Sequence, residues 1–345
     1  MQKKSLNTLS MAALMALGTT TSAYACNAAH VLGVGSASSA YTISANTMRK
    51  GSFFVGINTE KVQNKTLSDT SIIKAMQAGS EHLHNIDTID SHAISFAYGI
   101  SDKLSLNLQL PYITRTNIRA GEDDGGGPEV HPHDDTAGLG DLSALLQYKV
   151  YDKGFKVAVL GGIKAPTGKD NIVQAGEALE ADLLPGSGSW DLFAGSAITK
   201  DYENFSLHSN VLYKHNTKGT ADSQLGDILS YNVAFSYNHT AHKPHELICL
   251  VEDHLPGSEK SKEEGHYSIA SFIEFNGELA KKDSFDGVIS ENTGHNVIFA
   301  TVGMQVATQD KYSFFFAVSK PISQDLNGLQ NEIDYRASIG LGKSF

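Results

Sequence analysis

The chain of 345 residues lacks the common sequence signatures of enzymes. It contains two cysteines, Cys26 and Cys249, and one tryptophan. It has no Gly-x-Ser-x-Gly elbow, no Walker loop, no Cys-x-x-Cys pair and no His-Glu-x-x-His motif. We therefore expect no enzyme, with one alternative: a barrel lipase site made of a serine and a histidine on adjacent strands would leave no local signature.

Long hydrophobic runs are also absent. The N-terminus has Lys3 and Lys4, a short apolar run at 9–17 and the small-x-small sequence Ala23-Tyr24-Ala25. Together these indicate a bacterial signal peptide over 1–25. No later stretch reaches the roughly 18 consecutive apolar residues of a membrane-spanning helix. If this chain crosses a membrane, it must do so as a β-barrel.

Basic residues are outnumbered. The sequence has 27 Lys and Arg against 38 Asp and Glu, a formal net charge of −11. The signal peptide carries two lysines and no acidic residue, so the mature chain has a charge of −13. This acidic balance argues against nucleic acid as a partner.

What the sequence has in quantity is alternation of apolar and polar residues. In "KLSLNLQLPY" (103–112) every second residue is leucine, ending on Tyr112, and in "LSYNVAFSYN" (229–238) aromatic and aliphatic residues alternate with small polar ones. A period of two predicts strands with one apolar and one polar face. Phe299 and Phe315 are exceptions, because they fall on the otherwise small or polar side.

The alternation predicts about twelve strands. They are expected near 50–60, 91–101, 103–115, 139–151, 155–165, 187–199, 204–214, 226–238, 266–276, 295–307, 311–320 and 332–345. An ambiguous apolar stretch at 247–251 could pair with one near 284–290, which would raise the count to 14.

Loop lengths and strand lengths distinguish an outer-membrane barrel from a soluble sandwich. Short connections near 101, 152, 201 and 308 alternate with long polar ones at 61–90, 116–138, 166–186, 215–225, 277–294 and 321–331. Only 239–265 breaks this rule. Short periplasmic turns and long extracellular loops are typical of outer-membrane barrels, and segments of about 9–13 residues suit a tilted crossing. We predict an all-β, antiparallel transmembrane β-barrel over 50–345 in the bacterial outer membrane, with its apolar face on lipid.

The C-terminal strand carries a further signal. In "DYRASIGLGKSF" the side chains of Tyr335, Ile339, Leu341 and Phe345 share a face, and the chain ends on the aromatic residue. This resembles the signal read by the bacterial barrel-assembly machinery, which we therefore expect as a partner.

Residues 138–215 resemble a known family. "GLGDLSALLQYKVY", "VAVLGGIKAPTGKD" and "GSGSWDLFAGSAITKDYENFSLHSNVLYKH" are similar to the outer-membrane barrels named for the meta-pathway of phenol degradation. The matching elements are Gly138 to Asp141, Pro166-Thr167-Gly168, Gly186-Ser187-Gly188 and Asp191. The resemblance implies a fold of about 12 strands and a channel role, without fixing the solute. The insertion at 239–265 and the histidine-rich loops depart from the family pattern.

Residues 26–49 are small, polar and without periodicity, which leaves two interpretations: a segment that plugs the lumen or one that stays in the periplasm. Cys26 follows the cleavage site and is a candidate for lipidation. A disulfide between Cys26 and Cys249 is a second alternative, because the compartment is oxidising. An inert thiol at each position is the third.

The polar faces of the predicted strands supply the candidate lumen lining. Several cations there would favour anionic or dipolar solutes, unless they pair with inward acids such as Asp141 and Asp191. The candidates are Asn107, Gln109, Lys156, Lys164, His208, Asn210, Lys214, Asn232 and Arg336.

Histidines beside carboxylates supply candidate metal ligands in two long loops. His-x-His pairs with neighbouring acids suit Zn²⁺, Cu²⁺ or Ni²⁺, and Asp123-Asp124 before three glycines suits Ca²⁺. The alternative is a solvated acidic loop without a bound cofactor. A third cluster, His239, His242, His245, His254 and His266, surrounds Cys249 at the opposite rim. The loop candidates are His82, His84, His131, His133, Asp134 and Asp135.

The function indicated by the sequence is passive uptake of small solutes through an outer-membrane channel. Solutes would diffuse past the lumen-facing polar residues, filtered by the loops 61–90 and 116–138. A metal-binding or metal-transporting barrel is the first alternative, and a barrel lipase is the second.

Overall fold

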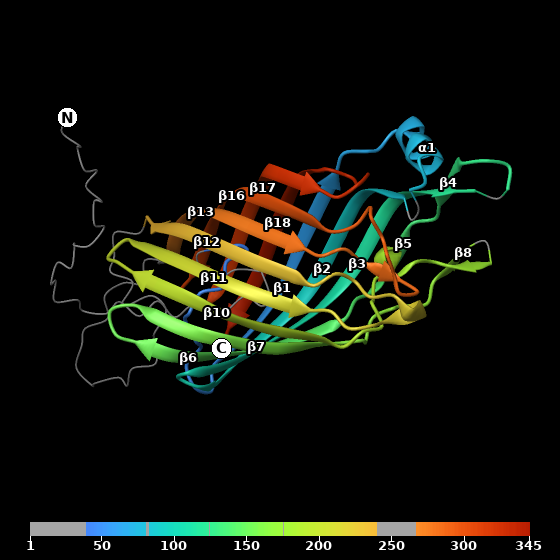
Figure 1. The fold of residues 1–345 in the computed structure, drawn as a ribbon. Helices are drawn as coiled ribbons and strands as arrows, with labels where there is room; N and C mark the ends of the chain where they lie inside the picture. Colours follow the sequence, from blue (N-terminus) through green and yellow to red (C-terminus); the bar gives the residue numbers. More distant parts are fainter. Residues whose placement is uncertain (1–38, 81–82, 124, 175, 240–266) are drawn as a thin grey trace, which may run out of the picture.

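The computed structural model describes residues 39–80, 83–123, 125–174, 176–239 and 267–345 (Figure 1). Twelve long antiparallel strands form a closed barrel in these residues. Closure is made by β1, which pairs with β2 on one side and with β18 on the other. The barrel strands are β1 (Phe53–Asn64), β2 (His84–Ser101), β3 (Leu104–Glu122), β6 (Leu142–Asp152), β7 (Lys156–Ala165), β10 (Asp191–Asp201), β11 (Phe205–His215), β12 (Ile228–Asn238), β13 (Tyr267–Ala280), β16 (His295–Thr308), β17 (Tyr312–Leu326) and β18 (Ile333–Ser344).

Short elements decorate one end of the barrel. Two extra strands, β4 (Glu129–His133) and β5 (Thr136–Leu139), pair with the C-terminal half of β3. The helix α1 (Asp69–Gln77) packs nearby, with Ile72 buried. The remaining elements are the hairpins β8 (Val173–Gln174) with β9 (Glu177–Ala178) and β14 (Ser284–Phe285) with β15 (Val288–Ile289), and the 3₁₀ turns η1 (Ala181–Leu183) and η2 (Thr220–Asp222). No helix of the described residues is long and apolar enough to cross a membrane.

The prediction of twelve strands is confirmed. Of the two extra strands in the 14-strand alternative, the one near 284–290 is wrong. The residues near 284–290 form the hairpin β14–β15, which lies outside the barrel sheet. Its proposed partner at 247–251 lies outside the described residues. A two-residue hairpin cannot satisfy the backbone groups of a barrel wall, which needs long strands paired on both sides.

The loops 61–90 and 116–138 are shorter than predicted. β2 begins at His84 and β3 continues to Glu122, and the two stay paired up to that end. Beyond the membrane a strand needs no apolar face, so its backbone pairing continues where the sequence alternation fades. The connection between β1 and β2 is therefore 65–83, and it contains α1.

The two faces of the wall are chemically opposite. In β3, Ser105 and Asn107 are 0% and 2% exposed, whereas the alternating leucines of the same strand are partly exposed. The same division holds around the barrel: Ile198, Val211, Phe235, Ile273 and Leu341 are exposed. An exposed apolar belt around a closed barrel with a polar interior is the construction of an outer-membrane protein. The leucines of 103–112 therefore face lipid.

The short turns and the C-terminus lie at one end of the barrel, at the left in Figure 1, and α1, β4 and β8 lie at the other. Since turns face the periplasm in such barrels, the decorated end is extracellular. Inward-facing phenylalanines fit the crowded lumen because glycines on neighbouring strands make room. A Cβ on Gly340 would overlap the ring of Phe315, and one on Gly303 would overlap the ring of Phe272.

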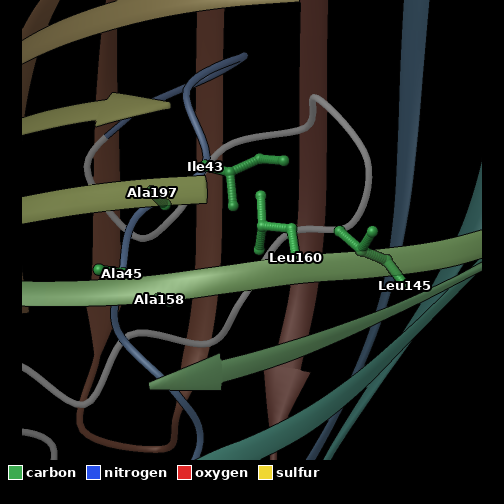
Figure 2. Close-up of a cluster of buried hydrophobic side chains, with 6 residues drawn as sticks. All are labelled: Ile43, Ala45, Leu145, Ala158, Leu160 and Ala197. Atoms are coloured by element: carbon green, nitrogen blue, oxygen red, sulfur yellow. The ribbon is translucent and has the colours of Figure 1, made fainter. Parts of the chain in front are cut away.

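Residues 39–49 run inside the barrel. Lys50 contacts Asp102 at the periplasmic turn, whereas Tyr41 reaches Ser338 in the middle of β18. On the way, the segment packs apolar side chains against the wall (Figure 2). That cluster is Ile43, Ala45, Leu145, Ala158, Leu160 and Ala197.

Candidate functional site

The luminal segment, which we define as residues 39–49, is held by side chains of the barrel wall. The backbone N–H of Ile43 donates to Asn210 Oδ1 at 2.8 Å, and that of Ala45 donates to Thr199 Oγ1 at 2.8 Å. A segment without secondary structure must satisfy its buried backbone groups with side chains. The alternating polar wall supplies these partners.

Glu274 on β13 is the strongest anchor of the luminal segment. Its carboxylate accepts hydrogen bonds from the backbone N–H groups of Ala40, Tyr41 and Thr42, and from the Thr42 hydroxyl. Asn276 Nδ2 also donates to Glu274 Oε2, at 3.0 Å. The side chain is fully buried at 0% exposure. A buried carboxylate is stable only when it is fully hydrogen-bonded, so this anchor depends on the segment being in place.

A cavity of about 360 Å³ borders the luminal segment inside the barrel. Tyr41 and Ile43 of the segment form part of its lining, together with the rings of Phe193 and Phe299. Amide and charged groups complete the wall. These are Asn58, Glu60, Gln109, Asn210, Lys214, Asn232, Asn276, Glu278 and Arg336.

A second cavity of about 310 Å³ lies toward the extracellular end. It shares Lys214 and Ile228 with the first, and it is also lined by His84, Asp182 and His295. The two cavities therefore follow one another along the lumen, with Lys214 between them. Ala40, Tyr41 and Ile43 of the luminal segment line the first cavity of this path.

The predicted lumen residues all lie on strands of the wall, but they differ in their partners. Lys156 is bound to Asp201 and to Asn46 of the luminal segment, both at 2.7 Å. His208 is fully buried and contacts Thr199 Oγ1 at 3.0 Å. Asn107, also buried, donates to the Leu145 carbonyl. The residues that line the first cavity are Gln109, Asn210, Lys214, Asn232 and Arg336.

Among the predicted lumen cations, Lys214 and Arg336 differ from Lys156 and Lys164, since neither has a carboxylate within ion-pair distance among the described residues. Arg336 instead stacks its guanidinium on Phe299, 3.6 Å from the ring centroid, and lies 4.5 Å from the Tyr41 ring. Stacking of this kind stabilises a cation without neutralising it. Both side chains line the first cavity, as do the carboxylates of Glu60 and Glu278.

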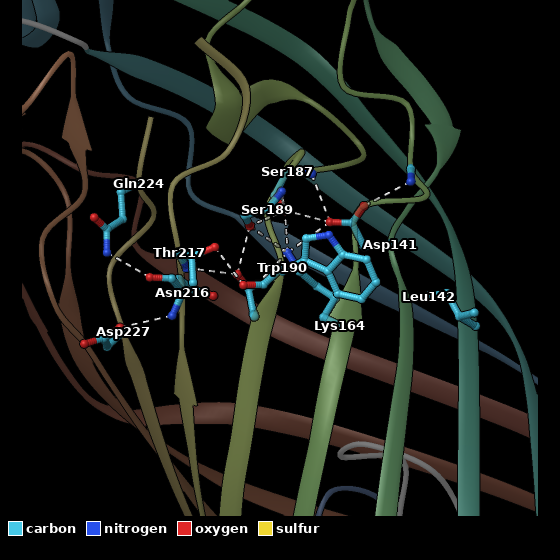
Figure 3. Close-up of polar contacts among 12 residues, drawn as sticks. Asp141, Leu142, Lys164, Ser187, Ser189, Trp190, Asn216, Thr217, Gln224 and Asp227 are labelled. Atoms are coloured by element: carbon cyan, nitrogen blue, oxygen red, sulfur yellow. Dashed lines mark hydrogen bonds and ion pairs between the residues drawn. The ribbon is translucent and has the colours of Figure 1, made fainter. Parts of the chain in front are cut away.

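Lys164 belongs to a polar cluster at the strand ends (Figure 3). Its ammonium forms ion pairs with Asp141 at 2.9 Å and with Asp191 at 2.6 Å. Asp141 also accepts hydrogen bonds from the backbone N–H groups of Gly168 and Ser187, each at 3.0 Å. The strand-end motifs of 138–191 thus converge on one carboxylate, and their role is to join β6, β7 and β10.

The described metal-ligand candidates of the loop 116–138 each have a separate partner within the protein. His131 lies 3.9 Å from Glu129, and His133 is bound to Glu122 at 2.8 Å. The backbone N–H of Asp134 donates to the side chain of Gln174, and the Asp135 carboxylate accepts from the backbone N–H of Asn117. Asp123 accepts hydrogen bonds from the N–H groups of the glycines that follow it. In the described residues these groups do not assemble into one set of metal ligands; His82 and Asp124 lie outside those residues.

His84 has different neighbours from those predicted. Its Nδ1 lies 2.9 Å from Asp182 Oδ2, and its Nε2 lies 3.8 Å from Glu180 Oε2. Burial alone would lower the pKa of His84, but the nearby carboxylates, Asp182 foremost, outweigh burial and raise it to about 9. Glu180 and Asp182 were missed in the sequence because they lie in a loop nearly a hundred residues away.

The other predicted residues are placed as follows. His239 contacts Ser271 Oγ at 2.8 Å, whereas His242, His245, His254, His266 and Cys249 lie outside the described residues, as do Cys26 and residues 1–25. On β18, Ile339 and Leu341 are exposed and Tyr335 is partly exposed, and Phe345, which follows this strand, is exposed as well. Phe345 stacks on Phe53 with ring centroids 4.6 Å apart.

The comparisons with known proteins agree with this architecture. Residues 88–244 match the family described as "Putative MetA-pathway of phenol degradation". This stretch includes the motifs of 138–191, so the resemblance seen in the sequence is confirmed there. No curated protein sequence matches the chain.

Solved structures show the fold at low identity. The COG4313 outer membrane channel from Pseudomonas putida F1 is 14% identical, over 87% of this chain and 98% of that one, with a TM-score of 0.54. The β domain of the Bordetella autotransporter BrkA is 10% identical over 86% and 100%, with a TM-score of 0.43. The NanC porin is 6% identical over 83% and 98%, with a TM-score of 0.42. The first of these structures shares the barrel fold of this chain.

Proposed function

We propose that this protein is an outer-membrane channel for the passive uptake of small solutes, and that residues 39–49 are its gate. The observation that carries this proposal is the pair of consecutive luminal cavities, about 360 and 310 Å³, above a segment that closes the periplasmic side. The channel named among the similar structures and the family match support the same role.

The lining of the first cavity indicates the class of solute. Its rings and aliphatic groups, Tyr41, Phe193 and Phe299 among them, favour an apolar part. Lys214 and Arg336 supply positive charge to this lining, and Glu60 and Glu278 supply negative charge beyond ion-pair distance from them. We propose solutes that combine an apolar ring or chain with an anionic or strongly dipolar group.

Passage requires the luminal segment to move. The anchors that hold it are polar groups of the wall, which water or a solute can replace, and not a continuous sheet pairing. A gate of this kind opens when its hydrogen bonds to Glu274, Asn210 and Thr199 exchange for bonds to water. The rest of the barrel is paired strand to strand and need not change.

The test is single-channel recording of the refolded mature protein in planar bilayers. We expect brief, small conductance steps from a channel that is closed most of the time. Addition of benzoate, a ring with a carboxylate, should reduce the ionic current more than addition of glycerol does. An absence of conductance from both the wild type and a variant with a loosened luminal segment would contradict the proposal.

An enzymatic role is the less favoured candidate. A barrel lipase needs a serine within hydrogen-bonding reach of a histidine that faces lipid. Purified protein incubated with phospholipid vesicles should release no fatty acid. Fatty-acid release that depended on a single serine would replace the channel proposal with this one.

A further inference from the structure

Three side chains with metal-binding groups meet at the extracellular mouth. His84 is the first residue of β2, Asp182 lies in η1, and Glu180 precedes η1. One ligand atom from each of the three lies within 4.8 Å of the others. His84 is 11% exposed, while Glu180 and Asp182 are 33% and 27% exposed. The cluster is thus open to solvent on the carboxylate side and enclosed on the imidazole side.

An apolar cluster holds the two acids in place. Leu179 and Leu183, on either side of Glu180 and Asp182, are buried against Ile118 of the barrel hairpin. The Thr136 hydroxyl also donates to the Leu183 carbonyl at 2.8 Å. The loop that carries the acids is therefore fixed to β3 and β5, and the arrangement exists before any ligand binds.

We propose that His84, Glu180 and Asp182 bind a divalent transition-metal ion such as Zn²⁺. Zinc bonds of about 2.0–2.2 Å to nitrogen and oxygen require ligand atoms roughly 3.3–3.5 Å apart. The three atoms here lie within 4.8 Å of one another. Because the two carboxylates face different ring nitrogens of His84 and only one nitrogen binds the ion, one carboxylate must turn toward the nitrogen that the other contacts. The 310 Å³ cavity, which both His84 and Asp182 line, gives water access to a fourth position.

The ligand set selects the kind of metal. One imidazole nitrogen with two carboxylates suits Zn²⁺, Ni²⁺ or Cu²⁺, whereas Ca²⁺ prefers six or more oxygen ligands. Glu122 acts on His84 as a further negative charge, and Arg115 acts on Asp182 as an opposing positive one. A bound ion would displace the proton from the ring nitrogen of His84 that it contacts, and it would then supply the positive charge near the two carboxylates.

The site would have a structural consequence, since its ligands come from different connections. His84 belongs to the β1–β2 side of the mouth, and Glu180 and Asp182 belong to the β7–β10 connection. A metal ion would fix these two parts together across the entrance. The inference does not rest on the channel proposal, because binding can be measured on protein that conducts nothing.

The test is titration of the refolded mature protein in detergent with Zn²⁺, followed by calorimetry, with Co²⁺ absorption as a second readout. We expect a strongest site that takes one ion per chain and gives a Co²⁺ spectrum of low coordination number. H84Q and D182N should each weaken that site by about tenfold or more. H131Q, which changes an exposed loop histidine, should leave it unchanged.

Folding is checked for every variant by heat-modifiable gel migration. If H84Q fails to fold, H84C serves in its place, since a thiolate at this position should add a sulfur-to-Co²⁺ charge-transfer band. Three outcomes overturn the inference: no stoichiometric binding, equal losses in H131Q and D182N, or equally tight Ca²⁺ binding that D182N does not affect.

Discussion

Thr42 and Glu274 form a two-point contact in the lumen: the backbone N–H and the hydroxyl of Thr42 both donate to Oε2 of Glu274, at 3.0 and 2.8 Å. The two residues are 232 positions apart in the sequence. This contact joins the luminal segment to the barrel wall. In the proposed gate, control therefore depends on one buried carboxylate.

The first prediction concerns that carboxylate. Glu274→Gln keeps the shape but replaces one acceptor oxygen with an N–H₂ donor facing N–H groups. Loss of charge-assisted hydrogen bonds of about 1.5–3 kcal/mol each should weaken the closed state by about 2–3 kcal/mol, and the open probability should rise by roughly 30–160-fold. Single-channel recording measures this directly.

The control for that variant is Glu332→Gln, which alters an exposed ion pair with Lys65 at the extracellular end. Its open probability should equal that of the wild type. Equal open probabilities for Glu274→Gln and the wild type would show that the luminal segment is not the gate.

The second prediction concerns Lys164. Lys164→Met leaves Asp141 and Asp191 facing each other without their shared cation, and removal of one partner from a buried pair costs about 3–5 kcal/mol. Urea unfolding in detergent should show this loss. Trp190, the single tryptophan, lies in this polar cluster (Figure 3) and gives the fluorescence signal.

Lys320→Met is the matched control, because Lys320 is exposed and lies 3.4 Å from an exposed Asp334. Its unfolding free energy should change by less than about 0.5 kcal/mol. A loss for Lys164→Met no larger than for this control would mean that solvent already screens the cluster.

The third prediction concerns the close backbone contact of Gly168 with Gly186 and Gly140, next to the same cluster. A Cβ on Gly168 would lie 2.7 Å from the Cα of Gly186 and 2.8 Å from the carbonyl carbon of Gly140. These neighbours are backbone atoms and cannot turn aside, so Gly168→Ala should cost about 2 kcal/mol or more. Gly161→Ala is the control, since nothing lies within 4 Å of the position that its methyl group would take. Equal unfolding midpoints for the two variants would contradict the contact.

The fourth prediction is a pH dependence at the extracellular loop. Burial raises the pKa of Asp283 to about 6, although the Gly226 N–H donates to it. A raised carboxyl pKa stabilises the fold below the unfolded pKa of about 3.9, and this stabilisation is lost as the pH rises through 6. Asp283→Asn should therefore stabilise the protein at pH 7.5 by about 1–2 kcal/mol, after allowance for solvent screening.

Urea unfolding at several pH values tests this sign. The advantage of Asp283→Asn should shrink as the pH falls and disappear near pH 4. An advantage that grows toward low pH would mean that Asp283 is ionised and stabilising in the native loop.

Much of the barrel was predictable because its signal is local. Each strand shows its two faces within about ten residues, as in 103–112, and the alternation of turn and loop lengths gives the order of crossings. Strand ends were less predictable. β2 and β3 extend beyond the alternating stretch because pairing continues outside the membrane, where no apolar face is needed.

The candidate sites were predicted less completely. The inward direction of the lumen candidates follows from strand parity, which is a local property of the sequence. Glu274 was missed, although an acid between Ile273 and Phe275 on the polar side of a strand was a usable signal. Glu180 and Asp182 gave none, since their meeting with His84 depends on the folding of a loop onto β3.

By itself the sequence determined the strands, their two faces and the two ends of the barrel, because a period of two and the turn lengths are properties of neighbouring residues. Tertiary structure alone decided where residues 39–49 lie, which carboxylate anchors them, and which acids surround His84. The physical reason is that these contacts join segments about 100 to 230 positions apart. Such contacts form only when closure of the barrel brings its wall around the luminal segment.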